Sequence, residues 1–268
     1  MPVAPDGSAY ELIGPEDAPC VVLIHGLGLN RACWQWTSPA LVDGYRVLSY
    51  DLYGHGASAD PPETPSLTLF SLQLQGLLDH CGIADAVIVG FSLGGMIARR
   101  FAQDCPERAR ALVILHSPHQ RGAEAQAAIL ARVEQARDEG PQSTVEAALE
   151  RWFTEGFRTA NPAMMETVRG WVTANRKEVY HRIYRVLADG IDEITAPVPP
   201  LTCPALVITG DEDYGNGPEM TRAIAAEIEG AQALILPGLR HMALAEDPAA
   251  VNTPLRRFLD SLPKGATG

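Results

Sequence analysis

Ser92, with a glycine two residues before it and another two residues after it, is the strongest candidate for a reactive residue in the sequence. In Gly90-Phe91-Ser92-Leu93-Gly94 the serine follows an apolar run and precedes a stretch with helical periodicity. This is the G-x-S-x-G pattern at a turn from a strand into a helix, which lifts the serine hydroxyl clear of the sheet. Side chains at the two glycine positions would collide with the neighbouring helix and strand. The pattern predicts a nucleophilic serine, and a serine that only caps a helix is the alternative.

A serine nucleophile needs a base that takes its proton and a carboxylate that orients the base. Asp211 and Asp213 follow the apolar run 205–209, which places carboxylates on a loop at the carboxyl end of a strand. His241 follows the next apolar run, and a buried structural histidine is the alternative reading of it. We predict Ser92, Asp213 and His241 as the catalytic residues, with Asp211 as the rival acid.

The negative charge that develops on an attacked carbonyl oxygen needs two preorganised backbone N–H donors. Leu93 directly follows Ser92 at the start of a helix, where free N–H groups and the helix dipole favour negative charge. The glycine-rich turn 25–28 follows another apolar run and offers the amide of Leu27. We predict that Leu27 and Leu93 form an oxyanion hole. A tight turn with His25 in a structural hydrogen bond is the alternative, and we assign His25 no proton transfer.

Short apolar runs rich in Val, Ile and Leu supply the strands that must hold these groups. The runs are apolar on both faces, as in a parallel sheet covered by helices on both sides, and stretches with helical periodicity lie between them. The predicted strands are 20–24, 46–50, 86–90, 111–115, 205–209 and 233–236, and the predicted helices are 67–82, 92–105, 218–228 and 247–261. The order of these elements predicts an α/β fold with a mostly parallel, doubly wound sheet.

The alternation of strands and helices stops between Pro118 and about Pro200. Residues 120–189 have the pattern of several amphipathic helices without a convincing strand, and a stiff proline-rich linker at 196–200 leads to the next strand. We therefore expect a helical lid inserted into the core. The expected domains are a core of residues 1–118 and 198–268 and a cap of residues 119–197.

The composition excludes several classes of protein. Of the 268 residues, 46% are hydrophobic and 20% charged, which is typical of a globular domain with a substantial core. The 21 Lys and Arg against 33 Asp and Glu give a formal net charge of −12, so nucleic acid is not an expected partner. No stretch approaches the ~18 apolar residues of a membrane span and no secretory signal is visible, so we expect a cytoplasmic protein. The five cysteines form no CxxC pair, so neither a disulfide framework nor a metal site is expected.

Five spaced motifs resemble those of the α/β-hydrolase superfamily. They are His25-Gly26-x-Gly28, Asp51-x-x-Gly54-x-Gly56-x-Ser58, Gly90-x-Ser92-x-Gly94-Gly95, Gly210-x-x-Asp213 and His241-x4-Glu246-x-Pro248. Within the superfamily the chain resembles 3-oxoadipate enol-lactonases and related carboxylic-ester hydrolases, mainly in the lid segment 148–154. The resemblance implies the α/β-hydrolase fold, a structural turn at 51–58, and a cofactor-independent serine hydrolase. Its expected partner is a small-molecule carboxylic ester or lactone.

The resemblance also bears on the substrate pocket. Relatives place the stretch after the first turn beside the acyl pocket, so we expect Asn30, Cys33 and Trp34 there, and Trp152 on the lid; packing of a helix on the sheet is the alternative for Trp34. Several lid arginines could meet a substrate carboxylate as planar forks, although solvated helix faces explain most of them. They are Arg151, Arg158, Arg169, Arg176, Arg182 and Arg185.

Other chemistries occur on the fold that the resemblance implies. Epoxide hydrolases and haloalkane dehalogenases carry a carboxylate where Ser92 stands, which excludes a direct match. Perhydrolases and haloperoxidases share the Gly-Phe-Ser-x-Gly-Gly pattern, and cofactor-free dioxygenases and hydroxynitrile lyases also keep a Ser/His/Asp set. A hydrolase-like receptor that signals through lid movement is the alternative from a different class. Arg31 replaces the third glycine of a dinucleotide fingerprint, so no nucleotide cofactor is expected.

Overall fold

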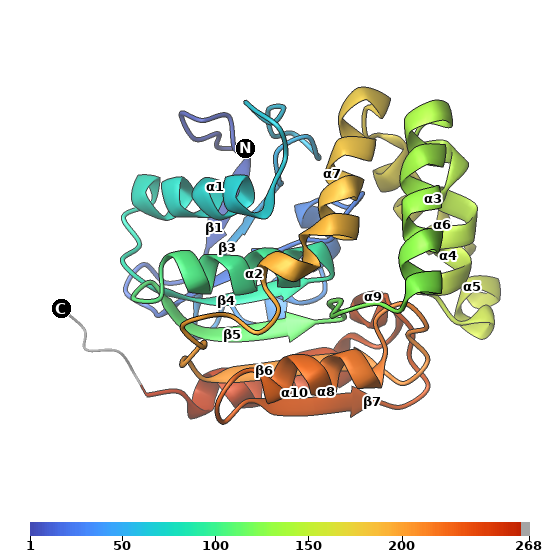
Figure 1. Ribbon diagram of the computed structural model, residues 1–268. Coiled ribbons are helices and arrows are strands. Elements are labelled where there is room, and N and C mark those ends of the chain that lie inside the picture. Colours follow the sequence, from blue (N-terminus) through green and yellow to red (C-terminus); the bar gives the residue numbers. More distant parts are fainter. Residues whose placement is uncertain (264–268) are drawn as a thin grey trace.

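A seven-stranded sheet lies at the centre of the computed structural model, which describes residues 1–263 (Figure 1). The strands are β1 (Tyr10–Ile13), β2 (Cys20–Ile24), β3 (Arg46–Tyr50), β4 (Ala86–Phe91), β5 (Ala109–Leu115), β6 (Ala205–Gly210) and β7 (Gln232–Leu236). Their order across the sheet is β1-β3-β2-β4-β5-β6-β7. All neighbours pair in parallel except β1, which is antiparallel to β3. The fold is the predicted α/β-hydrolase fold, with a mostly parallel, doubly wound sheet.

The six strands predicted from apolar runs are all present, with bounds within two residues of the prediction. Every residue of β2, β4 and β6 is buried, because covered parallel strands have two apolar faces. Strand β1 was not predicted. It lies at the edge of the sheet, and its half-buried and exposed residues alternate, so it lacks the continuous apolar run that identifies the inner strands.

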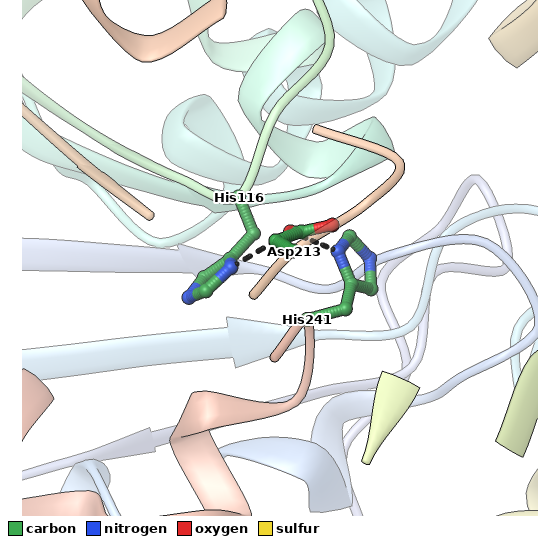
Figure 2. Close-up of side chains that lie close together, drawn as sticks. All are labelled: His116, Asp213 and His241. Atoms are coloured by element: carbon green, nitrogen blue, oxygen red, sulfur yellow. Dashed lines mark hydrogen bonds and ion pairs between the residues drawn. The ribbon is translucent and has the colours of Figure 1, made fainter. Parts of the chain in front are cut away.

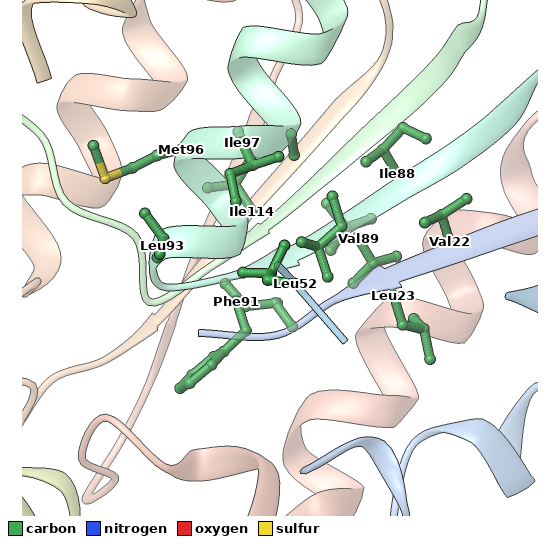
Figure 3. Packing of buried hydrophobic residues seen from close by; sticks show 14 of the residues in the cluster. Val22, Leu23, Leu52, Ile88, Val89, Phe91, Leu93, Met96, Ile97 and Ile114 are labelled. Carbon is green, nitrogen blue, oxygen red and sulfur yellow. The ribbon is translucent and has the colours of Figure 1, made fainter. Parts of the chain in front are cut away.

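Helices with the predicted positions flank the sheet in Figure 1. They are α1 (Leu67–His80), α2 (Leu93–Asp104), α8 (Pro218–Ala226) and α10 (Pro248–Ser261). Figure 3 shows Leu93 and Ile97 of α2 among the buried side chains of the sheet, near Ile114 of β5. Because these side chains are fully buried, the first turn of α2 is held firmly at the end of β4.

A helical insertion separates β5 from β6 and lies beyond the carboxyl ends of the strands (Figure 1). Its helices are α3 (Ala123–Glu139), α4 (Val145–Trp152), α5 (Glu155–Ala160), α6 (Pro162–Thr173) and α7 (Lys177–Asp189). The predicted insertion is therefore present. The division into a core of residues 1–118 and 198–268 and a cap of residues 119–197 stays a prediction, and residues 264–268 lie outside the described part. Within residues 1–263, no helix combines the length and the apolar character needed to cross a bilayer.

Candidate active site

The turn between β4 and α2 holds Ser92 in a strained backbone conformation. Its φ of 56° and ψ of −115° are rare for a residue that carries a side chain. A Cβ on Gly90 would collide with the carbonyl group of Gly94, and a Cβ on Gly94 would collide with that of Ile24. The close approach of these backbone segments therefore requires both glycines of the motif. The turn points Ser92 into a cavity that lies between the sheet and the inserted helices.

Asp213 and His241 meet on the loops that follow β6 and β7. Nδ1 of His241 lies 2.7 Å from Oδ2 of Asp213 (Figure 2). Oδ1 of Asp213 accepts hydrogen bonds from the backbone N–H groups of Gly215 and Asn216, at 3.1 and 3.0 Å. Burial by itself raises the pKa of Asp213, but the adjacent histidines and their hydrogen bonds lower this pKa well below its usual range. The ionised carboxylate can only accept, so Nδ1 of His241 carries a proton and donates a hydrogen bond to Oδ2.

Asp211, the rival acid, has a different role. Its side chain is exposed, and its Oδ1 accepts a hydrogen bond from the backbone N–H of Gly238 at 2.7 Å. In the described part of the chain, no hydrogen bond or ion pair joins Asp211 to His241. The geometry therefore favours Asp213 as the partner of the histidine and gives Asp211 a contact within the loops.

A second histidine, His116, shares the carboxylate of Asp213 and was missed by the sequence analysis. It directly follows β5, has a φ of 49° and is fully buried. Its Nδ1 lies 3.0 Å from Oδ2 of Asp213, the oxygen that also faces His241 (Figure 2). Burial lowers the pKa of His116, so it is a neutral imidazole that donates from Nδ1. The sequence signal for His116 is its position as a polar residue directly after β5, the buried strand that pairs with β6.

His116, Asp213 and His241 are also close enough together to be considered as ligands of a metal ion, and they form the one such group in the described chain. The ligand atoms of His116, Asp213 and His241 lie within 4.8 Å of one another. Both Nδ1 atoms are directed at Oδ2 of Asp213, at 3.0 and 2.7 Å, which are hydrogen-bond distances. We therefore interpret the cluster as two imidazoles that share one carboxylate.

Two buried, neutral histidines hold the loop after β2. Nδ1 of His25 is 2.8 Å from the carbonyl oxygen of Gly26, and its Nε2 accepts from the N–H of Leu52 at 2.9 Å. Nε2 of His55 accepts from the N–H of Gly28 at 3.0 Å. Burial lowers the pKa of His25 to about 4 and that of His55 to about 3, so both rings are neutral near pH 7. Their hydrogen bonds are structural, and they fix the loop on either side of Leu27.

In the part of the chain that the structure describes, the two amides predicted for an oxyanion hole have no backbone or side-chain acceptor. Leu27 lines the cavity beside Ser92, and within residues 1–263 its N–H donates no hydrogen bond. Leu93 is the first residue of α2, where an N–H group has no partner inside the helix. The oxyanion hole of Leu27 and Leu93 stays a prediction, with Leu27 the member of the pair that lines the cavity.

The cavity has a volume of about 100 Å³ and two different walls. The sheet wall is defined here by Leu27, Ser92, Asp213 and His241, and the lid wall by Arg121, Arg132, Arg151 and Trp152. The ring of Trp152 lies 6.0 Å from that of His241, measured between centroids. Pockets for drug-sized ligands measure roughly 300–1,000 Å³, so this cavity suits a smaller molecule.

Three of the four residues expected near the substrate do not line this cavity. Asn30 caps the 3₁₀ helix Arg31–Trp34 by accepting from the N–H of Ala32 at 2.9 Å. Cys33 and Trp34 are buried in the hydrophobic core. The structure thus corrects the expectation for Asn30, Cys33 and Trp34, because this segment turns back toward β3, where Arg31 pairs with Asp51. Trp152 is the one of the four that reaches the cavity.

The arginines of the lid wall differ from those that the sequence suggested. Arg151 lies on α4 and was among the candidates, whereas Arg132 on α3 and Arg121 before α3 were missed. Three of the other candidates have carboxylate partners: Arg169 pairs with Glu146, Arg176 with Asp60, and Arg185 with Asp189. Helical periodicity could not separate these groups, because it does not show which lid face covers the sheet.

The half-buried carboxylate of Glu246 joins the lid to the loop that carries His241. Oε1 of Glu246 accepts from the N–H and the hydroxyl of Thr154 at 2.7 and 2.8 Å, and Oε2 accepts from the N–H of Arg240 at 3.0 Å. The N–H of Met242 also donates to the carbonyl of Trp152 at 2.9 Å. The junction of α4 and α5 is therefore fixed to the segment on either side of His241.

The chain belongs to the α/β hydrolase family and is similar to several hydrolases of known name. The family model described as "Alpha/beta hydrolase family" matches residues 21–253. The chain is 30% identical over 204 residues to 3-oxoadipate enol-lactonase 2 of Acinetobacter baylyi, covering 76% of this chain and 75% of that protein. It is 27% identical over 243 residues to (E)-2-((N-methylformamido)methylene)succinate hydrolase of the same organism, covering 91% of each. The crystal structure of the enol-lactonase from Burkholderia xenovorans LB400 is similar with a TM-score of 0.88 at 28% identity, covering 95% of this chain and 96% of that chain.

Proposed function

Because this chain belongs to the α/β hydrolase family, we propose that it hydrolyses a small carboxylic ester or lactone through an acyl-enzyme on Ser92. One observation carries the proposal: the ionised Asp213 holds the protonated Nδ1 of His241 at 2.7 Å, and both line the cavity of the strained Ser92. The names of two relatives, 3-oxoadipate enol-lactonase and (E)-2-((N-methylformamido)methylene)succinate hydrolase, support a small carboxylic acid derivative as the substrate.

In the first half of the reaction, Oγ of Ser92 attacks the carbonyl carbon while Nε2 of His241 takes the hydroxyl proton. The N–H groups of Leu27 and Leu93 stabilise the oxyanion that forms. Asp213 stabilises the imidazolium of His241. The bond between the carbonyl carbon and the leaving oxygen then breaks, His241 returns the proton to that oxygen, and the acyl group remains as an ester on Ser92.

In the second half, His241 takes a proton from water, and the oxygen of this water attacks the acyl carbon. The bond to Oγ of Ser92 breaks, and His241 gives the proton back to the serine. An open ester yields an acid and an alcohol. A lactone yields one hydroxy acid, or its keto form when the released hydroxyl is an enol.

His116 is a positioning residue in this scheme. It donates from Nδ1 to Asp213 and makes no contact with reacting atoms. Because a hydrogen bond to a carboxylate favours the charged form, His116 helps to keep Asp213 ionised and oriented toward His241.

Steady-state hydrolysis of p-nitrophenyl esters from acetate to octanoate, beside a panel of small lactones, tests the proposal. We expect turnover that is highest for short acyl chains or lactones and absent in Ser92→Ala. Ser261→Ala, on the distant helix α10, is the matched control and keeps full activity. Absence of turnover on every substrate contradicts the proposal. Oxygen uptake, cyanide release, peroxide-dependent oxidation or ligand-dependent partner binding would then indicate a dioxygenase, a lyase, a perhydrolase or a receptor.

A further inference from the structure

The lid wall gathers three guanidinium groups without a carboxylate partner. Across residues 1–263, no Asp or Glu forms an ion pair with Arg121, Arg132 or Arg151. The chain has 33 acidic residues against 21 basic ones, so acids to pair with them are not scarce. Within the described residues, Asp213 is the one carboxylate that lines the cavity, and both of its oxygens already accept hydrogen bonds.

The hydrogen bonds that these arginines make go to neutral groups. Nε of Arg132 donates to the hydroxyl of Tyr184 at 3.1 Å, and Arg121 reaches the carbonyl oxygen of Ala188 at 3.5 Å. In the described chain, the Arg151 side chain makes no hydrogen bond to another protein group. The contact with Tyr184 orients the plane of the Arg132 guanidinium and leaves its outer N–H groups for another acceptor.

Burial and mutual repulsion make the positive charges of the lid-wall arginines less favourable. Burial, followed by the charge of Arg132, lowers the pKa of Arg121 to about 10 and also lowers the pKa of Arg151. Arg169 shows the opposite situation on the exposed face of α6, where its ion pairs with Glu146 and Glu166 raise its pKa. A ligand with negative charge would relieve the repulsion on the lid wall and would supply the missing acceptors.

We propose that Arg121, Arg132 and Arg151 form a carboxylate-binding subsite, so that the substrate is an ester or lactone that also bears a carboxylate. This inference rests on the proposed function, because it places the subsite opposite the nucleophile Ser92. A planar guanidinium matches the two oxygens of a carboxylate with parallel hydrogen bonds, which a lysine cannot do. The cavity of about 100 Å³ leaves room for a short acid rather than a long acyl chain.

Mono-p-nitrophenyl glutarate and p-nitrophenyl pentanoate, whose acyl chains have the same length, test the proposal. We expect kcat/KM of the unmodified protein to be about 10- to 100-fold higher for the anionic ester, the range of a hydrogen-bonded charge pair. Arg132→Gln and Arg151→Gln abolish this preference, because kcat/KM falls far more for the anionic ester than for the neutral ester. Arg151→Lys keeps part of the preference because it keeps the charge without the fork.

Arg169→Gln is the matched control, since Arg169 is a lid arginine whose partners are Glu146 and Glu166. It retains the preference for the anionic ester. Equal kcat/KM for the two esters in the unmodified protein, or a preference that survives Arg132→Gln/Arg151→Gln, overturns the subsite.

Binding of glutarate to Ser92→Ala, measured by calorimetry and as a shift in Tm, tests the subsite without hydrolysis. We expect binding that Arg132→Gln/Arg151→Gln removes from the Ser92→Ala protein. Glutarate binding without hydrolysis of either ester supports the subsite and contradicts the proposed function. Hydrolysis that depends on Ser92, without glutarate binding, supports the proposed function and overturns the subsite. Inorganic phosphate that binds as tightly as glutarate overturns the assignment to carboxylates.

Discussion

The sheet wall and the lid wall face the same cavity, but their charges are balanced in different ways. On the sheet wall, Asp213 accepts hydrogen bonds at both oxygens, from the loop and from two histidines. On the lid wall, the three guanidinium groups have neutral partners or none in the part of the chain that the structure describes. The fold by itself completes the polar contacts of the Asp213 carboxylate, whereas the guanidinium groups of the lid wall lack the acceptors that a ligand would bring.

Because of this difference, substitutions in the two walls are expected to have different effects on activity. Changes in the sheet wall are expected to affect every substrate, because they alter the groups that we propose to react with the ester bond. Changes in the lid wall should affect substrates according to their charge. The ratio of kcat/KM for the anionic and neutral esters therefore reports on the lid wall, and their common level reports on the sheet wall.

Ser92→Ala has the largest expected effect. Without the proposed nucleophile, kcat/KM is expected to fall about ten-thousand-fold or more, and by the same factor for the anionic and the neutral ester. Purified protein, checked for folding by circular dichroism, is assayed with both esters. A loss confined to one of the two esters would contradict the assignment of Ser92 to the sheet wall.

Asp213→Asn is expected to have the next largest effect. The amide cannot accept the Nδ1–H of His241 as a carboxylate does, so kcat falls about a thousandfold or more for both esters. Asp211→Asn is the control from the same loop, because Asp211 contacts Gly238 and not the histidine. Equal losses of kcat in the two variants would show that the pairing at 2.7 Å does not identify the acid.

His116→Ala has an intermediate effect and a diagnostic pH dependence. Removal of a donor to Asp213 leaves more negative charge acting on His241, so the imidazolium is favoured and a higher pH is needed for the neutral base. The acidic limb of the profile of kcat/KM against pH therefore moves to higher pH, with about a tenfold loss at pH 7.

His116→Asn is the matched variant, because an asparagine amide can replace the Nδ1 donor and tolerates the φ of 49°. It is expected to restore both the rate and the position of the acidic limb. A pH profile that His116→Ala leaves unmoved would mean that His116 only fills space.

Glu246→Gln has the smallest expected effect, because Glu246 connects the walls without facing the ligand. The amide group cannot accept from both Thr154 and Arg240, so the free energy of unfolding falls by about 1–3 kcal/mol. The rates of both esters fall only a few-fold. Denaturant unfolding measures the loss, with Glu155→Gln on the exposed start of α5 as the control. Equal stability of the two variants would contradict a stabilising role of the contacts that Glu246 makes with Thr154 and Arg240.

Elements with a strong local pattern were predicted from the sequence, and elements without one were not. The continuous apolar runs of β2, β4 and β6 and the glycines around Ser92 act within a few residues, so they are visible in the sequence itself. Strand β1 has the weaker alternating pattern of a sheet edge. The stretch that contains Asn30 looked like a pocket segment, but its course depends on the pairing of Arg31 with Asp51, which lies twenty residues away.

The sequence alone determined the α/β fold, the helical insertion, the turn at Ser92 and the order of serine, acid and histidine along the chain. Contacts between distant segments showed that Asp213, and not Asp211, pairs with His241, and that His116 shares the same carboxylate. They also brought Arg121 and Arg132 together with Arg151 on one wall of the cavity. The physical reason is the range of the forces. Backbone geometry and hydrophobic periodicity depend on neighbours along the chain, whereas the charge and the partners of a buried side chain depend on segments that the fold brings together.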